Sequence, residues 1–281
     1  MKGIEGKVAV VTGAGRGLGE ASARRLAELG AHVVVVDIDE DAATAVAKSL
    51  ATPGLPVRAD VSVEAEVIGY HAAATEAYGR VDLHHLNAGV FGTFDALPDL
   101  SVDDFERVMR INVIGQFLGL REAFRQFRIR QASGTIVVTA SIAGLTGSAD
   151  LLPYQTSKHA VNGLIHGAAV YGGPLGIRVN GVAPGIVPTE LFAGPDADHG
   201  GGKSDMEQRA STTPLRRAGS AQEIADVAAY LLSDESTYVT GQILSADGGA
   251  SIVNTVRPSG GAGRWDPRDI DTMTYQNGER Q

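Results

Sequence analysis

The sequence predicts an α/β protein in which helices cover both faces of a doubly wound, parallel, seven-stranded sheet. Short runs of β-branched residues alternate with longer helical patterns along the chain, and this alternation is typical of strand–helix–strand units. Most of the runs are largely apolar, as expected for strands that are buried on both faces. The predicted strands span residues 8–12, 32–36, 56–59, 81–86, 135–139, 177–182 and 242–245. Because residues 1–250 contain no break in composition, no repeat and no long linker, we predict that they form one domain.

The clearest helix is predicted over residues 102–130, where apolar side chains recur at steps of three or four residues and mark one face. These side chains are Phe105, Met109, Val113, Phe117, Leu120 and Phe124. A second helix is predicted directly after the first strand. Its inner face is expected to hold Leu18, Ser22, Leu26 and Leu29.

Two segments depart from the alternation of strands and helices. Residues 186–216 hold Pro188, Pro195, Pro214 and the run 200–202 of glycines among scattered charges, so we expect a mobile loop next to a substrate. Residues 251–281 form a C-terminal extension whose composition suits a disordered tail or a tail that docks on a neighbouring subunit. It holds Trp265, the only tryptophan, and we predict that it packs near a subunit contact or a pocket.

Composition and charge exclude several classes of protein. The 281 residues include no cysteine, which excludes disulfide frameworks, thiolate metal sites and cysteine nucleophiles. Lys and Arg number 24 against 33 for Asp and Glu, and the net charge of −9 argues against a nucleic-acid partner. Because no long apolar run or signal segment is found, we expect a cytoplasmic protein that does not bind membranes. His84 and His85 should point to opposite faces of a strand, so no metal site is predicted.

A cluster of glycines joins the first predicted strand to its helix, in the sequence Thr12-Gly-Ala-Gly-Arg-Gly-Leu-Gly19. A strand, a glycine turn and a helix start in this order predict a phosphate-binding loop. Glycines let a pyrophosphate approach the backbone, and the N–H groups and dipole of the helix start attract its negative charge. The residues expected to contact a dinucleotide here are Gly13, Arg16, Gly17, Leu18 and Gly19. A tight turn without a ligand is the alternative interpretation.

Asp37 ends the second strand, where a carboxylate can accept hydrogen bonds from both ribose hydroxyls of an adenosine. The same carboxylate would repel a 2′-phosphate by ~4 kcal/mol at about 4 Å and an effective dielectric near 20, before screening. Asp37 therefore predicts NAD in preference to NADP. Arg16 argues for NADP, because a basic side chain in the glycine loop could reach that phosphate. The alternative role for Asp37 is to cap a helix that starts near Glu40.

Tyr154 and Lys158 lie four residues apart behind Pro153, at the start of a predicted helix, so they share one helix face. Lowering the pKa of a tyrosine from 10 to near neutrality takes about 4 kcal/mol of preferential stabilisation of the phenolate, and a neighbouring ammonium is the simplest source. An exposed helix turn with an incidental Tyr and Lys is the alternative. Ser141 weighs against it, because it follows the strand at residues 135–139 and ligands of parallel sheets bind beyond the carboxyl ends of strands.

In combination, these motifs resemble the short-chain dehydrogenase/reductase family, in its common single-domain form with a Rossmann fold. The resemblance covers about residues 4–250. Its motifs are Thr12-Gly-x-x-x-Gly-x-Gly19, Asp60-Val61, Asn87-Ala-Gly89, Asn112, Ser141, Tyr154-x-x-x-Lys158, and Pro184-Gly185 followed by Thr189. The resemblance implies hydride transfer between NAD(H) and an alcohol or carbonyl. The chain departs from the family at Leu86, where a second asparagine is usual, and this puts a local structural hydrogen bond in doubt.

The resemblance also implies roles for single residues. Tyr154 would be the general acid in carbonyl reduction and the general base in alcohol oxidation, and Ser141 would hydrogen-bond the substrate oxygen. Lys158 would lower the pKa of Tyr154 and hold the nicotinamide ribose. Asn112 would interrupt its helix and support a water that links Lys158 to solvent. The residues implied around the cofactor are Asp60 and Val61 toward the adenine, then Asn87, Ala88 and Gly89, and finally Pro184, Gly185, Ile186 and Thr189, with the last two toward the carboxamide.

Apolar side chains beside the motifs predict a pocket for an apolar or cyclic secondary alcohol or ketone. They are Phe91, Phe94, Ile142, Leu145, Leu151, Leu152 and Phe192. Two alternatives stay open: a reductase of 3-oxoacyl thioesters, and a nicotinamide-binding scaffold or redox sensor without turnover. By resemblance we expect a homotetramer with the helix after Lys158 at a subunit interface. Gly163 and Gly167 suit such an interface or tight packing on the chain's own sheet.

Overall fold

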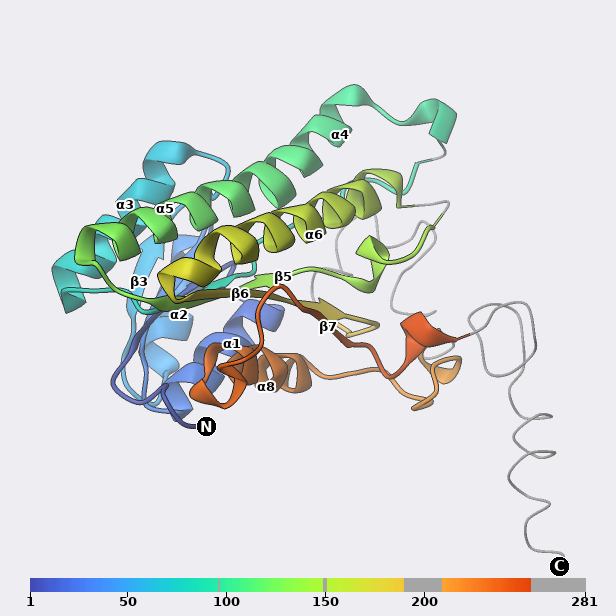
Figure 1. The fold of residues 1–281 in the computed structure, drawn as a ribbon. Helices are drawn as coiled ribbons and strands as arrows, with labels where there is room; N and C mark the ends of the chain where they lie inside the picture. Colours follow the sequence, from blue (N-terminus) through green and yellow to red (C-terminus); the bar gives the residue numbers. More distant parts are fainter. Residues whose placement is uncertain (96, 149–150, 190–208, 254–281) are drawn as a thin grey trace, which may run out of the picture.

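Seven strands form one parallel sheet in the order β3-β2-β1-β4-β5-β6-β7 (Figure 1). The strands are β1 Val8–Thr12, β2 His32–Asp37, β3 Leu55–Arg58, β4 Leu83–Leu86, β5 Gly134–Thr139, β6 Ile177–Pro184 and β7 Ile243–Ala246. The computed structural model describes residues 1–95, 97–148, 151–189 and 209–253. The predicted sheet is confirmed, and its strand ends differ from prediction by at most two residues, as at Leu83 and Pro184.

Helices lie on both faces of this sheet, as predicted. α1 (Gly17–Glu28), α2 (Glu40–Ser49) and α8 (Ala221–Leu232) cover one face, and α3 (Glu64–Tyr78), α4 (Val102–Met109), α5 (Gly115–Arg130) and α6 (Leu152–Gly172) lie on the other (Figure 1). Short 3₁₀ turns occur at Leu97–Asp99, Ile142–Gly144, Gly173–Leu175, Asp234–Ser236 and Ala250–Ile252. Side chains cap several helix starts: Asp39 caps α2, Ser101 caps α4, and Ser220 forms a capping box with Glu223 on α8.

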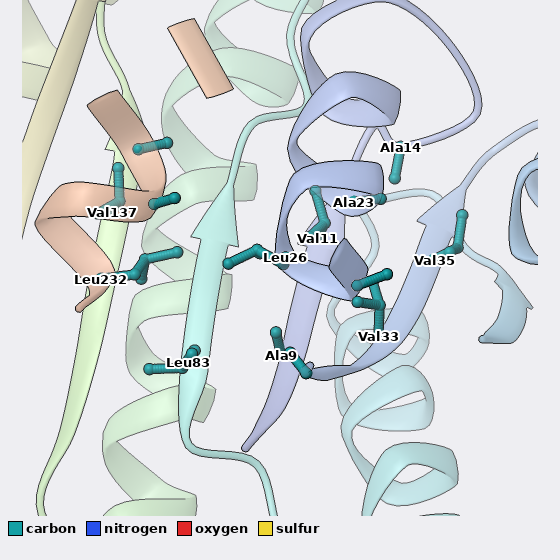
Figure 2. Close-up of a cluster of buried hydrophobic side chains, with 14 of the residues drawn as sticks. Ala9, Val11, Ala14, Ala23, Leu26, Val33, Val35, Leu83, Val137 and Leu232 are labelled. Atoms are coloured by element: carbon teal, nitrogen blue, oxygen red, sulfur yellow. The ribbon is translucent and has the colours of Figure 1, made fainter. Parts of the chain in front are cut away.

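The alternation of side chains along each strand divides the core into two layers. In β1, Ala9 and Val11 belong to the layer that includes Leu26 of α1 (Figure 2). Val8 and Val10 belong to the layer on the α3 side. Because helices cover both faces, the strands have few positions for polar residues, and this explains why apolar runs predict them well.

The helix predicted over residues 102–130 is interrupted, as the resemblance implied. Arg110–Ile114 form a π-helical turn between α4 and α5, and this turn holds the buried Asn112. Only part of the predicted apolar stripe packs toward the sheet. Leu120 of the stripe is buried in the core cluster that includes Phe127, and Phe124 packs against this cluster, whereas Phe117 is 41% exposed. Apolar residues occur on more than one side of α5, so periodicity identifies a stripe without showing which of its residues are buried.

The outer side of α5 forms a groove with α6, and its volume is about 930 Å³. Phe117 and Phe124 of α5 line it, and so does Tyr171 of α6. Gly163 and Gly167 also line the groove, and a Cβ added to either would meet no described atom within 4 Å. The alternative in which these two glycines pack tightly on the chain's own sheet is therefore wrong.

Within the described ranges, no helix is long and apolar enough to cross a membrane. Residues 190–208 of the predicted loop, with Phe192, lie outside the described residues. The same holds for residues 254–281 of the predicted extension, with Trp265.

Candidate active site

The predicted site residues meet at the carboxyl edge of the sheet. The glycine loop follows β1, Asn87 follows β4, and Ser141 follows β5. The strand order reverses between β1 and β4, and ligands of doubly wound sheets bind at such a reversal. The topology therefore brings together motifs that are far apart in the sequence.

The glycine loop has the backbone geometry that a pyrophosphate requires. Gly13 and Gly17 have positive φ angles of 62° and 58°, a region that is costly for residues with a Cβ. A Cβ on Gly19 would overlap the carbonyl oxygen of Gly13, so α1 starts in close contact with the end of β1. Arg16 precedes α1 and forms no side-chain cap, so it leaves the N–H groups of the first turn to a ligand. The residues present fit a dinucleotide.

Asp37 faces this loop from the end of β2. Its Oδ2 accepts a hydrogen bond from the Gly15 N–H (2.8 Å), and its Oδ1 accepts one from the Asp39 N–H (3.0 Å). The cap of α2 is Asp39, whose carboxylate accepts from the Ala42 N–H, so the alternative role for Asp37 as this cap is wrong. Asp39 also forms a 3.1 Å ion pair with Arg16.

Hydrogen bonds connect the loop after β4 to the glycine loop. Thr12 Oγ1 accepts hydrogen bonds from the N–H groups of Asn87 (2.9 Å) and Ala88 (3.2 Å), and Asn87 Nδ2 donates to the carbonyls of Thr12 and Gly13. From α5, Gln116 donates to the Ala88 carbonyl (2.7 Å). Thr12 and Gln116 were not among the predicted site residues. The position of Thr12 directly before Gly13 was a usable signal, whereas Gln116 gave none.

Asn112 joins the segment after this loop to α6. Its Oδ1 accepts from the Val90 N–H (2.8 Å), and its Nδ2 donates to the Val90 carbonyl (2.8 Å) and to Ser157 Oγ (3.0 Å). Ser157 directly precedes Lys158. Leu86, where the family usually has an asparagine, is buried in an apolar cluster with Phe127.

α6 brings Tyr154 and Lys158 to the same edge. The Lys158 Nζ lies 5.5 Å from the Tyr154 ring centroid and donates a hydrogen bond to the Thr139 carbonyl (2.8 Å). Tyr154 is 8% exposed and Lys158 is 3% exposed, so the alternative of an exposed, incidental helix turn is wrong. Ser141, which follows β5, is near enough to the Tyr154 phenol for a side-chain hydrogen bond that lowers the phenol's pKa. The three predicted side chains are therefore neighbours.

Burial has the largest effect on the pKa of both titratable groups. It raises the pKa of Tyr154 to about 12, although the hydrogen bond with Ser141 acts in the opposite direction. It lowers the pKa of Lys158 to about 8. The expected lowering of the Tyr154 pKa by Lys158 does not offset burial in the chain alone. A phenol that keeps its proton in a buried site can donate it to a developing alkoxide.

The predicted residues after β6 reach the glycine loop. Gly185 follows Pro184 and donates to the Ala246 carbonyl on β7 (3.1 Å), which keeps the strand end in the sheet. Thr189 lies across the glycine loop, because a Cβ on Gly17 would be 3.6 Å from the Thr189 Cβ. The loop after β6 therefore lies next to the glycine loop after β1.

Asp60 and Val61 follow β3 on the same side of the sheet. Asp60 Oδ1 accepts a hydrogen bond from the Ser62 N–H (2.8 Å), and the Asp60 N–H donates to Glu66 (2.7 Å). Val61 packs on Gly115, the first residue of α5. These contacts fix the turn between β3 and α3.

Aromatic side chains of the predicted pocket lie against Tyr154. The ring centroid of Phe91 is 4.5 Å from that of Tyr154 and 6.2 Å from that of Phe94. Asp104, which was not predicted, accepts from the Thr93 N–H (2.9 Å) and so holds the loop between the two phenylalanines. The other predicted pocket residues that the structure describes are half-buried Ile142, Leu151 and Leu152, and Leu145, which is exposed.

The chain is similar to enzymes of known activity over most of its length. A family model described as "Enoyl-(Acyl carrier protein) reductase" matches residues 13–251. Levodione reductase from Leifsonia aquatica is 37% identical over 252 residues, which are 87% of this chain and 94% of that protein. Mitochondrial borneol dehydrogenase from Lavandula x intermedia is 38% identical over 255 residues, which are 90% of this chain and 94% of that protein. Trans-4-hydroxycyclohexanecarboxylate dehydrogenase from Sinomonas cyclohexanicum is 36% identical over 260 residues, which are 89% of this chain and 95% of that protein.

Solved structures agree with this family match. The crystal structure of levodione reductase matches with a TM-score of 0.83 and 36% identity, over 88% of this chain and 98% of that chain. A 3-ketoacyl-(acyl-carrier-protein) reductase from Brucella melitensis, complexed with NADH, matches with a TM-score of 0.82 and 31% identity. The match covers 88% of this chain and 99% of that chain. The family model, the relatives and the fold all point the same way, and the chain is an oxidoreductase that belongs to the short-chain dehydrogenase/reductase family.

Proposed function

We propose that the protein is an NAD-dependent alcohol dehydrogenase or carbonyl reductase, which transfers a hydride between NAD(H) and an apolar or cyclic secondary alcohol or ketone. One observation carries this proposal: Tyr154, Lys158 and Ser141 are neighbours at a sheet edge whose glycine loop fits a dinucleotide. Burying a phenol and an ammonium is costly, and a binding module without turnover has no use for that pair.

Tyr154 and Ser141 act on the substrate oxygen. A nicotinamide held at this edge would supply the hydride acceptor for alcohol oxidation and the hydride donor for ketone reduction. Ser141 donates a hydrogen bond to the substrate oxygen, and Tyr154 gives it a proton in reduction or removes one in oxidation. Because the pKa of Tyr154 is raised in the chain alone, the phenol is ready for reduction, and oxidation should accelerate as pH rises.

Lys158 and Asn112 support Tyr154. Lys158 holds the nicotinamide ribose and places its positive charge near the phenol. Asn112 ties the loop after β4 to α6 through Val90 and Ser157, and supports a water that connects Lys158 to solvent.

NAD is the proposed cofactor, and its binding surface runs along the sheet edge. Asp37, which faces the glycine loop, would accept from the adenosine ribose hydroxyls, and the pairing of Arg16 with Asp39 supports NAD over NADP. The related 3-ketoacyl reductase from Brucella melitensis forms a complex with NADH, which supports the same cofactor here. The remaining proposed contacts are Gly13, Gly17, Leu18, Gly19, Asp60, Val61, Asn87, Ala88, Gly89, Pro184, Gly185, Ile186 and Thr189.

The proposed substrate class follows from the apolar surroundings of Tyr154. Phe91 packs on the Tyr154 ring, and Phe94 follows behind it. Three relatives are named for reactions of cyclic compounds, levodione, borneol and hydroxycyclohexanecarboxylate. An apolar, aromatic lining next to Tyr154 suits a cyclic substrate.

A 3-oxoacyl thioester is the second candidate substrate. The 3-ketoacyl-(acyl-carrier-protein) reductase at 31% identity favours it, and the description of the matching family model also names an acyl carrier protein. The chemistry at Ser141 and Tyr154 would be the same, and only the group that carries the carbonyl would differ.

One activity screen tests the proposal. Cyclic and linear secondary alcohols, the corresponding ketones and a 3-oxoacyl thioester are each offered with NAD(H) and with NADP(H). We expect the highest kcat/KM with a cyclic ketone or alcohol and NAD(H). Preference for the thioester would select the second candidate, preference for NADP(H) would overturn the cofactor, and tight NADH binding without turnover would make the protein a sensor.

We also propose that the protein is a homotetramer in which a second copy covers the groove between α5 and α6. The groove exposes Phe117, and the open space at Gly163 and Gly167 lets another backbone approach. Sedimentation equilibrium measures the assembly directly, and a monomer at all concentrations would contradict this proposal.

A further inference from the structure

Two adjacent histidines on β4 have different surroundings. His84 and His85 are both fully buried and, as predicted, lie on opposite faces of the sheet. The His84 ring lies 5.2 Å from His71 and 5.4 Å from Phe127, and within the described residues neither of its nitrogens has a hydrogen-bond partner. His85 Nε2, in contrast, lies 2.9 Å from Thr139 Oγ1 on β5.

The His85 contact begins a chain of hydrogen bonds with one possible direction. Asn87 Nδ2 donates to the carbonyls of Thr12 and Gly13, so the atom that faces Thr139 is the acceptor Oδ1. Thr139 Oγ1 therefore donates its only hydrogen to Asn87 Oδ1 (2.9 Å). From His85, Thr139 can then only accept, which places the hydrogen of the neutral imidazole on Nε2. Burial lowers the pKa of His85 to about 4, so the ring stays neutral at working pH.

This series of hydrogen bonds leads from His85 to both loops of the candidate cofactor site. Asn87 is the residue that fastens the loop after β4 to the glycine loop at Gly13. Thr139 is also the residue whose carbonyl accepts from the Lys158 Nζ. A histidine at the centre of the sheet is thus connected, through one hydroxyl, to the backbone that would surround a dinucleotide.

We propose that His85 is a positioning residue for dinucleotide binding. Its Nε2–H orients the Thr139 hydroxyl toward Asn87 Oδ1, and the Asn87 amide is thereby held with its Nδ2 on the carbonyls of the glycine loop. His84 fills the core on the other face and has no part in this chain. The inference rests on the proposed binding of NAD(H) and adds a residue that touches neither substrate nor cofactor.

The test measures the Kd for NADH by nicotinamide fluorescence. His85→Leu removes the donor and should raise Kd about fivefold, which is the scale of one hydrogen bond. Thr139→Val removes the hydroxyl and should raise Kd by at least as much. The double variant should bind no more weakly than Thr139→Val alone, because both changes break one chain. His85→Gln keeps a side-chain N–H donor, and Thr139→Ser keeps the hydroxyl, so both should bind within about twofold of the wild type.

His84→Leu is the matched control, because it is the same substitution one residue earlier on the same strand. It should leave the Kd for NADH within about twofold of the wild type. Equal weakening by His84→Leu and His85→Leu, or multiplying effects of His85→Leu and Thr139→Val, would overturn the inference. If His85→Leu does not fold, His85→Met and His84→Met replace the two leucine variants in the same comparisons. A wild type that does not bind NADH overturns the proposed function first, and the inference with it.

Discussion

The carboxyl edge of the sheet and the groove between α5 and α6 differ in how their side chains are partnered. At the edge, polar groups are buried and bonded, as when Lys158 donates to the Thr139 carbonyl and Asn112 spans Val90 and α6. In the groove, Phe117 is 41% exposed and Gly167 faces open space within the described chain. One region buries polar groups among hydrogen bonds, and the other leaves apolar area uncovered.

This difference indicates that the edge is a site of chemistry and that the groove is a contact surface. Buried titratable groups reduce the stability of a fold and are usually found where they do chemistry. An uncovered apolar groove is typical of a surface that meets another apolar surface. Substitutions at the edge should therefore change turnover or cofactor binding and leave the assembly intact, and substitutions in the groove should do the reverse.

Lys158→Met should have the largest effect and separates function from stability at the edge. Turnover should fall roughly 100-fold or more, because Tyr154 loses the cation beside it. The free energy of unfolding at pH 7 should rise by up to ~3 kcal/mol, because burial lowers the pKa of Lys158 from 10.5 to about 8 and methionine carries no charge to bury. Urea unfolding and steady-state rates measure both, with the exposed Lys48→Met as the control that should change neither.

The pH dependence of that stability difference has a definite sign. Lys158 has a lower pKa in the folded chain than in the unfolded chain, so the wild type becomes more stable as pH rises from about 8 to about 10.5. Lys158→Met lacks this rise. Its advantage should be complete below pH 8 and shrink toward pH 10. A variant less stable than the wild type at pH 7 would show that the hydrogen bond to Thr139 outweighs the burial of charge.

Gly167→Glu tests the groove. A charged side chain in this apolar surface should dissociate the assembly, while the Kd for NADH stays within about twofold of the wild type. Gly69→Glu is the matched control, since Gly69 is also a helical glycine with open space before it and lies on α3, outside the groove. Analytical ultracentrifugation should find smaller species for Gly167→Glu only. An unchanged assembly would show that the groove is not a subunit contact.

Asp37→Ser is expected to have a smaller effect, on cofactor choice. KM for NAD should rise roughly tenfold, because the ribose hydroxyls lose a charged acceptor, and KM for NADP should fall as the repulsion of its 2′-phosphate disappears. Asp41→Ser removes the same charge from the exposed first turn of α2 and should change neither KM. An unchanged ratio of the two KM values in Asp37→Ser would place the origin of selectivity elsewhere.

The parts of the fold that follow from local pattern could be predicted from the sequence. Apolar runs located the strands because the sheet is covered on both faces, and the glycine loop was identified from its position between β1 and α1. The i, i+4 spacing placed Tyr154 and Lys158 on one face, and the structure confirms this. Side-chain periodicity could not show which residues of the stripe pack in the core, as Leu120 does, and which stay exposed, as Phe117 does.

The contacts between strands could not be predicted, because they depend on register between distant segments. Thr139 meets His85 and Asn87 only because β5 lies beside β4 with Val137 opposite His85. Gln116, in the helix that follows the π turn, donates to Ala88 in the loop after β4. A single sequence contains no signal for such pairs, so the supporting residues of the site emerged only from the structure.

Tyr154→Phe tests the central claim most directly, since it removes one oxygen atom from the edge and leaves the ring against Phe91. The measurement combines the Kd for NADH with the rate of a single turnover on the best ketone of the screen. We predict NADH binding within about twofold of the wild type and a rate reduced by roughly three orders of magnitude, the range of general acid catalysis. A variant that binds NADH and still reduces the ketone at near the wild-type rate would contradict the role of Tyr154, and with it the proposed mechanism.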